Sequence, residues 1–309
     1  MKTRFLIALL FFGSLGFTSA QEKNYTAQEI AVNKIIDGTL LLPNGIKNPD
    51  LVIIIAGSGP TDRDGNQNFL KSNSLKKLAQ GLSEKNIATF RYDKRIVKQI
   101  RKGNVDKNIM FDDFVVDAKS VLNYFKNTKN YNKIYIAGHS QGSLIGLLTA
   151  KDGADGFISL AGAGQSIGSV LIEQVEKTAP MFLEDTKRIV KVLEEGKTTT
   201  NFPPALASIF SLEIQPFMSN WMSYNPQTEI KKLDMPILII NGTKDLQVSE
   251  AEAKLLHDAA PKAQLKIIDK MNHILVPIEG DDLENSKSYN EANRALAPEL
   301  IETIVSFIK

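Results

Sequence analysis

Short apolar runs rich in β-branched residues recur along the chain, and each ends in a turn or a polar segment. Continuous runs of this kind are typical of strands that are buried on both faces of a parallel sheet. They predict strands at residues 51–56, 87–92, 133–137, 156–160, 236–240 and 264–268. A weaker pattern at residues 31–42, before the turn at residues 43–45, predicts one or two edge strands.

Helical patterns alternate with these strands, at residues 70–85, 111–126, 143–151, 249–259 and 298–308. Pro298 suits the first turn of the last helix, because its missing N–H would have no partner there. The alternation predicts an α/β fold, in which helices flank a mostly parallel sheet. From about residue 165 to 231 only amphipathic helical stretches occur. We therefore expect one domain over residues 21–309, with a helical cap inserted between two strands.

The first twenty residues have the layout of a secretory signal peptide. Lys2 and Arg4 precede an apolar run at residues 5–12, and the small residues 18–20 precede Gln21. Glycine and serine interrupt the run, which falls short of the ~20 apolar residues that a membrane span needs. The sequence predicts a signal peptide at residues 1–20 and a secreted or periplasmic mature chain that has no membrane anchor.

Charge and composition narrow the possible partners. The 37 Lys and Arg residues nearly balance the 35 Asp and Glu residues, and removal of Lys2 and Arg4 would leave the mature chain with zero net charge. Without a basic cluster, a nucleic-acid or anionic-membrane partner is not expected. The absence of cysteine excludes disulfides, thiolate metal ligands and a cysteine nucleophile. We expect no metal and no cofactor, and the sequence carries no prediction of the oligomeric state.

Two segments match Gly-x-Ser-x-Gly, a pattern in which the serine occupies a sharp strand-to-helix turn. They are residues 138–142 and residues 164–168. Ser140 directly follows its predicted strand, and the number of strands before it fits the fold to which the pattern belongs. Three residues separate the second match from its strand. We therefore expect Ser140 to be a nucleophile and Ser166 to begin the first cap helix.

A serine hydroxyl needs a neighbouring base, and histidine titrates in the useful range. The chain contains His139, His257 and His273. His139 adjoins the nucleophile, so we expect its side chain to be directed elsewhere, and His257 fits a helix surface. His273 follows the last predicted strand, at the sheet edge where α/β folds build their sites. Elimination therefore favours His273 as the base.

The base requires an acceptor that fixes its tautomer and stabilises the imidazolium. Asp245 follows the strand at residues 236–240 and lies at the same sheet edge as His273. Asp269 is so close to His273 in sequence that a turn-capping role is more natural, and Asp234 precedes its strand and belongs at the opposite edge. We expect Asp245 to orient the base.

An acyl-transfer intermediate also needs donors for its oxyanion. We expect the backbone N–H groups of Gln141, at the start of the helix, and of Ser58, in the glycine-rich loop at residues 56–60. Arg63, between two aspartates, is predicted to form local ion pairs that brace this loop. In the cap, Trp221, Phe217 and Met222 fit either a substrate pocket or the packing face of a helix, and the pattern does not decide between them.

Several stretches together resemble exported bacterial esterases with the α/β-hydrolase fold, a family that includes serine aminopeptidases: residues 56–66, 91–93, 138–142, 241–245 and 272–273. The resemblance implies a serine carboxylesterase that acts on a small-molecule ester without a cofactor, with Ser140, Asp245 and His273 as its triad. Ile96 stands where relatives usually have glycine, which predicts a different shape for the loop after that strand.

Two other functions are compatible with the sequence. A serine aminopeptidase on the same fold would bind a substrate ammonium through acidic cap residues, for which the candidates are Glu173, Glu176, Glu184 and Asp185. A non-catalytic binding protein could also retain the fold. The presence of all three triad groups favours an ester hydrolase, because a binding protein has no need of them together.

Overall fold

The computed structural model describes residues 23–309, so the predicted signal peptide at residues 1–20 lies outside the described residues. Within them, one eight-stranded sheet has the order β1-β2-β4-β3-β5-β6-β7-β8. Its strands are β1 (Tyr25–Ala31), β2 (Asp37–Pro43), β3 (Leu51–Ile55), β4 (Ala88–Tyr92), β5 (Ile134–His139), β6 (Gly156–Leu160), β7 (Ile237–Gly242) and β8 (Gln264–Ile268).

The strands from β4 to β8 are all parallel, whereas β1 and β2 form an antiparallel edge beside β4. The prediction of edge strands at residues 31–42 was only partly right, because β1 lies upstream of that range. Of its side chains only Tyr25 is buried. An exposed edge strand has no buried face to produce a hydrophobic run, and the pattern therefore missed it.

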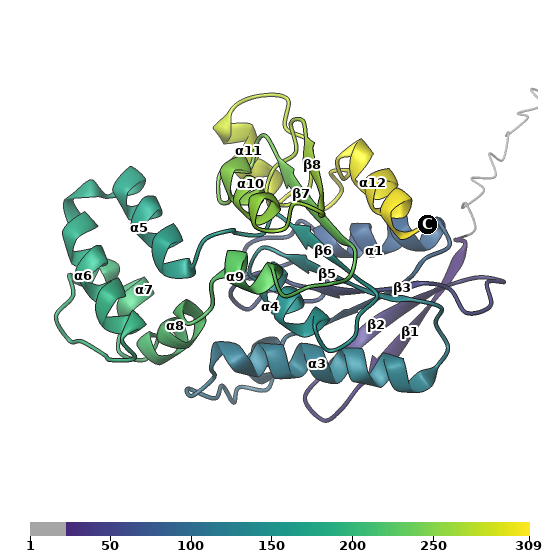
Figure 1. Ribbon diagram of the computed structural model, residues 1–309, viewed down its shortest axis with the longest axis horizontal. Helices are drawn as coiled ribbons and strands as arrows, with labels where there is room; N and C mark the ends of the chain where they lie inside the picture. Colours follow the sequence, from purple (N-terminus) through teal and green to yellow (C-terminus); the bar gives the residue numbers. More distant parts are fainter. Residues whose placement is uncertain (1–22) are drawn as a thin grey trace, which may run out of the picture.

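Helices cover both faces of the sheet (Figure 1). The first face packs against α3 (Phe111–Thr128), α4 (Gln141–Ala150) and α10 (Glu250–Ala259), and the second against α1 (Ser74–Glu84) and α12 (Pro298–Ile308). In β3, Leu51, Ile53 and Ile55 point to the first face, whereas Val52 and Ile54 point to the second. This two-sided burial explains the continuous apolar runs.

Two short helices were not predicted: α2 (Arg95–Arg101) and α11 (Asp282–Ser288). Val97 is the only buried residue of α2, and the buried residues of α11 are the polar Asn285 and Ser288. Each helix spans only 7 residues, too few to present the extended apolar repeat by which the longer helices are recognised.

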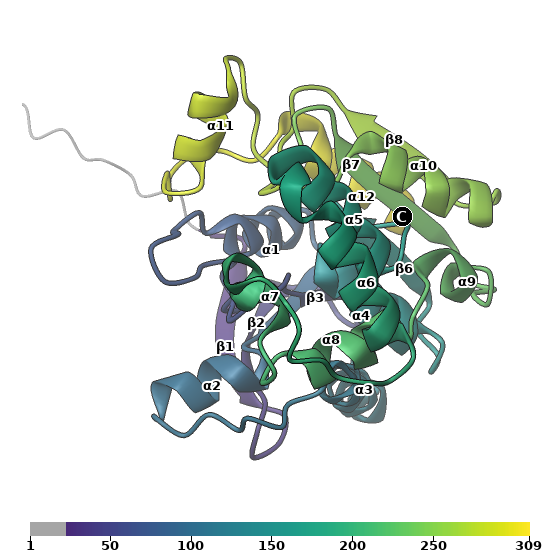
Figure 2. The same cartoon turned by 90° about the vertical axis from the view of Figure 1, so that its left-hand side faces the viewer.

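The interval between β6 and β7 holds five α-helices and two short 3₁₀ turns, at Pro180–Phe182 and Pro204–Leu206. The helices are α5 (Ile167–Thr178), α6 (Leu183–Glu194), α7 (Ala207–Phe210), α8 (Gln215–Met222) and α9 (Pro226–Ile230). Helices α5 to α8, here called the cap helices, have an apolar cluster of their own. They stand to one side of the sheet in Figure 1 and in front of it in Figure 2.

The cap helices are attached to the body mainly through α8 and α3. The indole ring of Trp221 stacks on Phe111, with ring centroids 5.5 Å apart and planes 4° from parallel. Asp112, beside Phe111, accepts hydrogen bonds from the Tyr224 hydroxyl (2.6 Å) and the Asn220 side-chain amide (3.0 Å). A membrane-spanning helix is absent from residues 23–309, since none combines the required length and apolarity.

Candidate active site

Ser140 occupies the sharp turn between β5 and α4, with φ 55° and ψ −123°. This backbone conformation is strained for a residue other than glycine, and such strain is concentrated at functional sites. The flanking glycines make the turn possible. A Cβ on Gly138 would collide with the backbone of Gly142, and a Cβ on Gly142 would collide with the carbonyl oxygens of Ile55 and Ala56.

His273 and Asp245 form a buried pair. The Nδ1 atom of His273 lies 2.8 Å from Oδ2 of Asp245. The other carboxylate oxygen, Oδ1, accepts hydrogen bonds from the backbone N–H groups of Gln247 (2.8 Å) and Val248 (2.9 Å). Three donors therefore hold the carboxylate, and Nδ1 of the ring carries the proton. In the described part of the chain Nε2 has no hydrogen-bond partner, and the ring lines the same cavity as Ser140.

His139 packs against His273. Its ring centroid lies 4.9 Å from that of His273, and its Nε2 lies 2.7 Å from the His273 carbonyl oxygen. Burial, with a smaller contribution from the nearby His273 ring, lowers the pKa of His139 to about 4. The neutral ring therefore donates its Nε2–H to that carbonyl and helps to fix the position of His273. The sequence did not suggest this role.

The other residues considered for the site lie elsewhere. Ser166 is the N-cap of α5, where its hydroxyl accepts a hydrogen bond from the N–H of Ser169 (3.4 Å). His257 is half-buried on α10, Asp234 is exposed, and Asp269 accepts a hydrogen bond from the Thr243 hydroxyl. None of these side chains lines the cavities that contain Ser140.

Ser58 and Gln141 line the same cavity as Ser140. Gln141 is the first residue of α4, so its N–H has no acceptor within the helix. The loop that carries Ser58 rests directly on the turn, because a Cβ on Gly57 would lie only 3.2 Å from Cβ of Ser140. The carbonyl oxygen of Ser58 accepts hydrogen bonds from the Thr61 hydroxyl and the Gln67 amide.

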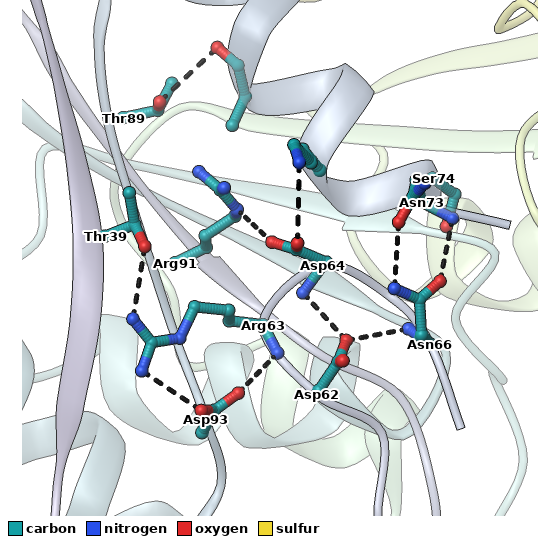
Figure 3. A network of polar contacts seen from close by, with 12 residues as sticks. Thr39, Asp62, Arg63, Asp64, Asn66, Asn73, Ser74, Thr89, Arg91 and Asp93 are labelled. Carbon is teal, nitrogen blue, oxygen red and sulfur yellow. Dashed lines mark hydrogen bonds and ion pairs between the residues drawn. The ribbon is translucent and has the colours of Figure 1, made fainter. Parts of the chain in front are cut away.

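A network of ion pairs holds the segment that follows this loop (Figure 3). Arg63 pairs with Asp93 (3.0 Å) and Asp37 (2.7 Å), and Arg91 pairs with Asp64 (2.9 Å). Arg63 lines neither cavity at Ser140. Its contacts are those of the local brace predicted from the alternating charges, and they join the loop after β3 to β4 and the sheet edge.

Two adjoining cavities meet at Ser140. The first, of about 460 Å³, lies beneath the cap helices, and the second, of about 300 Å³, contains His273. Ser58, Ser140 and Gln247 line both. The first cavity has a largely apolar wall, formed by Leu144, Ile167, Val170, Leu171, Ile209, Ile214, Met218, Trp221 and Val248.

Of the three aromatic and sulfur-containing residues considered for a pocket, only Trp221 lines this cavity. Phe217 lies outside it and packs against Phe111 and Phe114. Met222 is also outside it and is buried in the apolar cluster of the cap. Phe217 and Met222 therefore contribute to packing, and the expectation that they could line a substrate pocket is not met.

No Asp, Glu, Lys or Arg among residues 23–309 lines either cavity. The acidic cap residues Glu173, Glu176, Glu184 and Asp185 all lie outside the lining. Glu173 accepts a hydrogen bond from the side chain of Gln165, which does line the first cavity. The described residues likewise contain no cluster of three or more potential metal ligands.

Comparisons with known proteins agree with this architecture. Residues 71–202 match the family model described as "Serine aminopeptidase, S33". Esterase EstD of Thermotoga maritima is 25% identical over 264 residues, which are 84% of this chain and 62% of that protein. The chain thus spans less than two thirds of the length of this curated relative.

Solved structures resemble the chain over nearly its whole length. Est1E from Butyrivibrio proteoclasticus covers 91% of this chain at 18% identity and TM-score 0.57, with 98% of its own chain matched. The Pyrococcus furiosus esterase Pf2001 covers 92% at 13% identity and TM-score 0.53, with 90% of its own chain matched. The chain has the α/β-hydrolase fold, as predicted.

The lowered pKa of His139 predicts how the free energy of unfolding changes with pH. Between its folded pKa of about 4 and the ordinary value of 6.5, only the unfolded chain binds the proton, so stability is lost as the pH falls through this range. His139→Gln retains a donor for the His273 carbonyl but does not titrate. The free energy of unfolding, measured by urea denaturation, should fall less between pH 7.5 and pH 5.0 in the variant, by about 1–2 kcal/mol. Equal losses in the two proteins would contradict the assignment of a buried neutral His139.

Proposed function

We propose that the protein is a serine hydrolase that cleaves carboxylic esters through an acyl-enzyme. The observation that carries the proposal is the His273–Asp245 pair, at 2.8 Å, facing the cavity into which the strained turn presents Ser140. A hydroxyl, an oriented imidazole and a buried carboxylate are the three groups that this chemistry requires.

In the proposed reaction, Oγ of Ser140 forms a bond to the ester carbonyl carbon while Nε2 of His273 takes the hydroxyl proton. The N–H groups of Ser58 and Gln141 stabilise the resulting oxyanion. When the tetrahedral intermediate collapses, the bond to the alcohol oxygen breaks and His273 protonates the departing alcohol. Water then repeats the sequence on the acyl-Ser140 intermediate and releases the acid.

The cavities favour an ester over the substrate of an aminopeptidase. An aminopeptidase must bind a free ammonium, yet no acidic side chain of the described residues lines either cavity. A substrate ammonium placed there would lose its hydration without gaining a charged partner. The apolar walls beneath the cap helices suit an uncharged acyl group. Esterase EstD and the Pyrococcus furiosus esterase Pf2001 support the same reaction class.

Substitution of the two motif serines tests the nucleophile. Ser140→Ala should lower kcat for p-nitrophenyl butyrate by about 10⁴-fold or more, because the attacking oxygen is lost. Ser166→Ala, the matched control in the second motif, should retain kcat within about twofold, with at most ~1 kcal/mol lost from the helix cap. Circular dichroism checks that both variants fold.

The opposite result, activity retained in Ser140→Ala and lost in Ser166→Ala, would show that the second motif carries the nucleophile. Activity retained in both variants, or no hydrolysis of any ester by the unaltered protein, would contradict the proposed function and favour a binding protein.

The uncharged lining predicts a preference among acyl groups. The value of kcat/KM should be at least ~10-fold higher for p-nitrophenyl hexanoate than for p-nitrophenyl 6-aminohexanoate, whose ammonium would be desolvated without a partner. Gln174 lies at the exposed rim of the first cavity. Gln174→Glu should narrow the ratio about threefold at low salt, the effect expected of one exposed ion pair. Preference of the unaltered protein for the cationic ester, or for leucine p-nitroanilide, would favour the aminopeptidase.

We further propose that the protein is exported and that cleavage occurs after Ala20. The support is the charged, apolar and small-residue layout of residues 1–20. When the full chain is produced in a bacterial host, mass spectrometry of the exported protein should identify a terminus at Gln21. Ala20→Arg should block cleavage, because the site requires a small residue. Exported protein that begins at Met1 would contradict the proposal.

A further inference from the structure

Lys94 is a buried lysine that the proposed reaction does not use. It lies between β4 and α2, and only 2% of its surface is exposed. Both residues next to it form ion pairs, Asp93 with Arg63 (3.0 Å) and Arg95 with Asp117 (2.8 Å). These pairs fix the backbone on both sides of Lys94, whose side chain is directed into the molecule.

The Lys94 ammonium group contacts the loop that follows β3. Its Nζ donates a hydrogen bond to the carbonyl oxygen of Gly57 and lies 5.2 Å from the ring centroid of Phe114. It forms no ion pair with a carboxylate of residues 23–309. Burial lowers the pKa of Lys94 to about 7. A cation in this position is costly, and an apolar side chain of the same length would avoid that cost.

The contact determines the direction of a particular N–H group. The described residues contain no cis peptide bond, and in a planar trans peptide the C=O and the following N–H point in opposite directions. The Gly57 carbonyl points to Lys94, so the N–H of Ser58 points to the opposite side. The next carbonyl, that of Ser58, is held by Thr61 and Gln67. The peptide groups on both sides of the Ser58 Cα are therefore fixed, and Ser58 lines both cavities beside Ser140.

We propose that Lys94 is a positioning residue for the oxyanion site: it holds the Gly57 carbonyl so that the Ser58 N–H points to the intermediate formed on Ser140. This inference rests on the proposed function. While Lys94 is protonated, its hydrogen bond also polarises the Gly57–Ser58 amide, which strengthens the N–H of that amide as a donor. Lys94 itself does not touch the substrate and acts through the peptide group.

The test compares Lys94→Met with Lys98→Met. Methionine retains the length and apolar contacts of Lys94 but removes the donor. Lys98, on α2, forms a partly exposed ion pair with Asp37 and lines neither cavity at Ser140, so it is the matched control. Lys94→Met should lower kcat for an aryl ester about 10- to 100-fold, somewhat less than the loss of a complete oxyanion donor. Its KM should change less than threefold and its Tm should stay equal or rise. Lys98→Met should leave kcat unchanged.

The rate of hydrolysis of a thionoester, compared with that of the ester, distinguishes a positioning role of Lys94 from a purely structural one. Sulfur accepts hydrogen bonds weakly, so hydrolysis of the C=S analogue depends little on the oxyanion donors. Lys94→Met should therefore lower the ratio of ester to thionoester rates about 10-fold or more, whereas general damage to the fold would lower both rates together. An unchanged ratio in folded Lys94→Met overturns the proposal.

Lys94→Gln serves if the methionine variant fails to fold. Its amide is polar but too short to reach the Gly57 carbonyl from the same backbone position. A lowered ratio in this variant supports the positioning role, and an unchanged ratio overturns it. The proposed function fails separately, if the unaltered protein hydrolyses no ester or if Ser140→Ala retains activity.

Discussion

The close approach of the β5–α4 turn to the end of β3 is the constraint on which the site depends. Gly142 lies against the carbonyl oxygens of Ile55 and Ala56, and Gly57 lies against Ser140, with no room for a side chain at Gly142. This contact places the serine and the loop that carries the Ser58 amide within one small volume. It also explains why the strain at Ser140 persists, since the packed strands and helix on either side of the turn determine its backbone conformation.

The sequence predicted those parts of the fold and site that follow from local pattern. Strands such as β3 were recognisable because neighbouring side chains are buried on opposite faces of the sheet. Edge strand β1 and helix α2 were missed because they bury few side chains. Asp245 and His273 could be chosen because each follows the carboxyl end of a strand, and the structure brings the two within hydrogen-bond distance.

The residues that were missed make their contacts across long stretches of sequence. His139 meets the carbonyl of His273, 134 residues away, and Lys94 meets that of Gly57, 37 residues away. A pattern of neighbouring residues in the sequence does not indicate contacts between such distant positions. The three candidates for the pocket show the same limit of prediction from local sequence. Helical spacing puts Phe217, Trp221 and Met222 on apolar surface, but only the docking of the cap helices against the body decides that Trp221 lines the cavity.

Trp221 has two functions that cannot be separated. Trp221 lines the apolar cavity, and its ring is stacked on Phe111, which attaches α8 to α3. A smaller residue would enlarge the cavity and would weaken the attachment of the cap helices in the same step. Any enlargement of the cavity at this position therefore loosens the cap helices, unless another contact between them and the body is strengthened first.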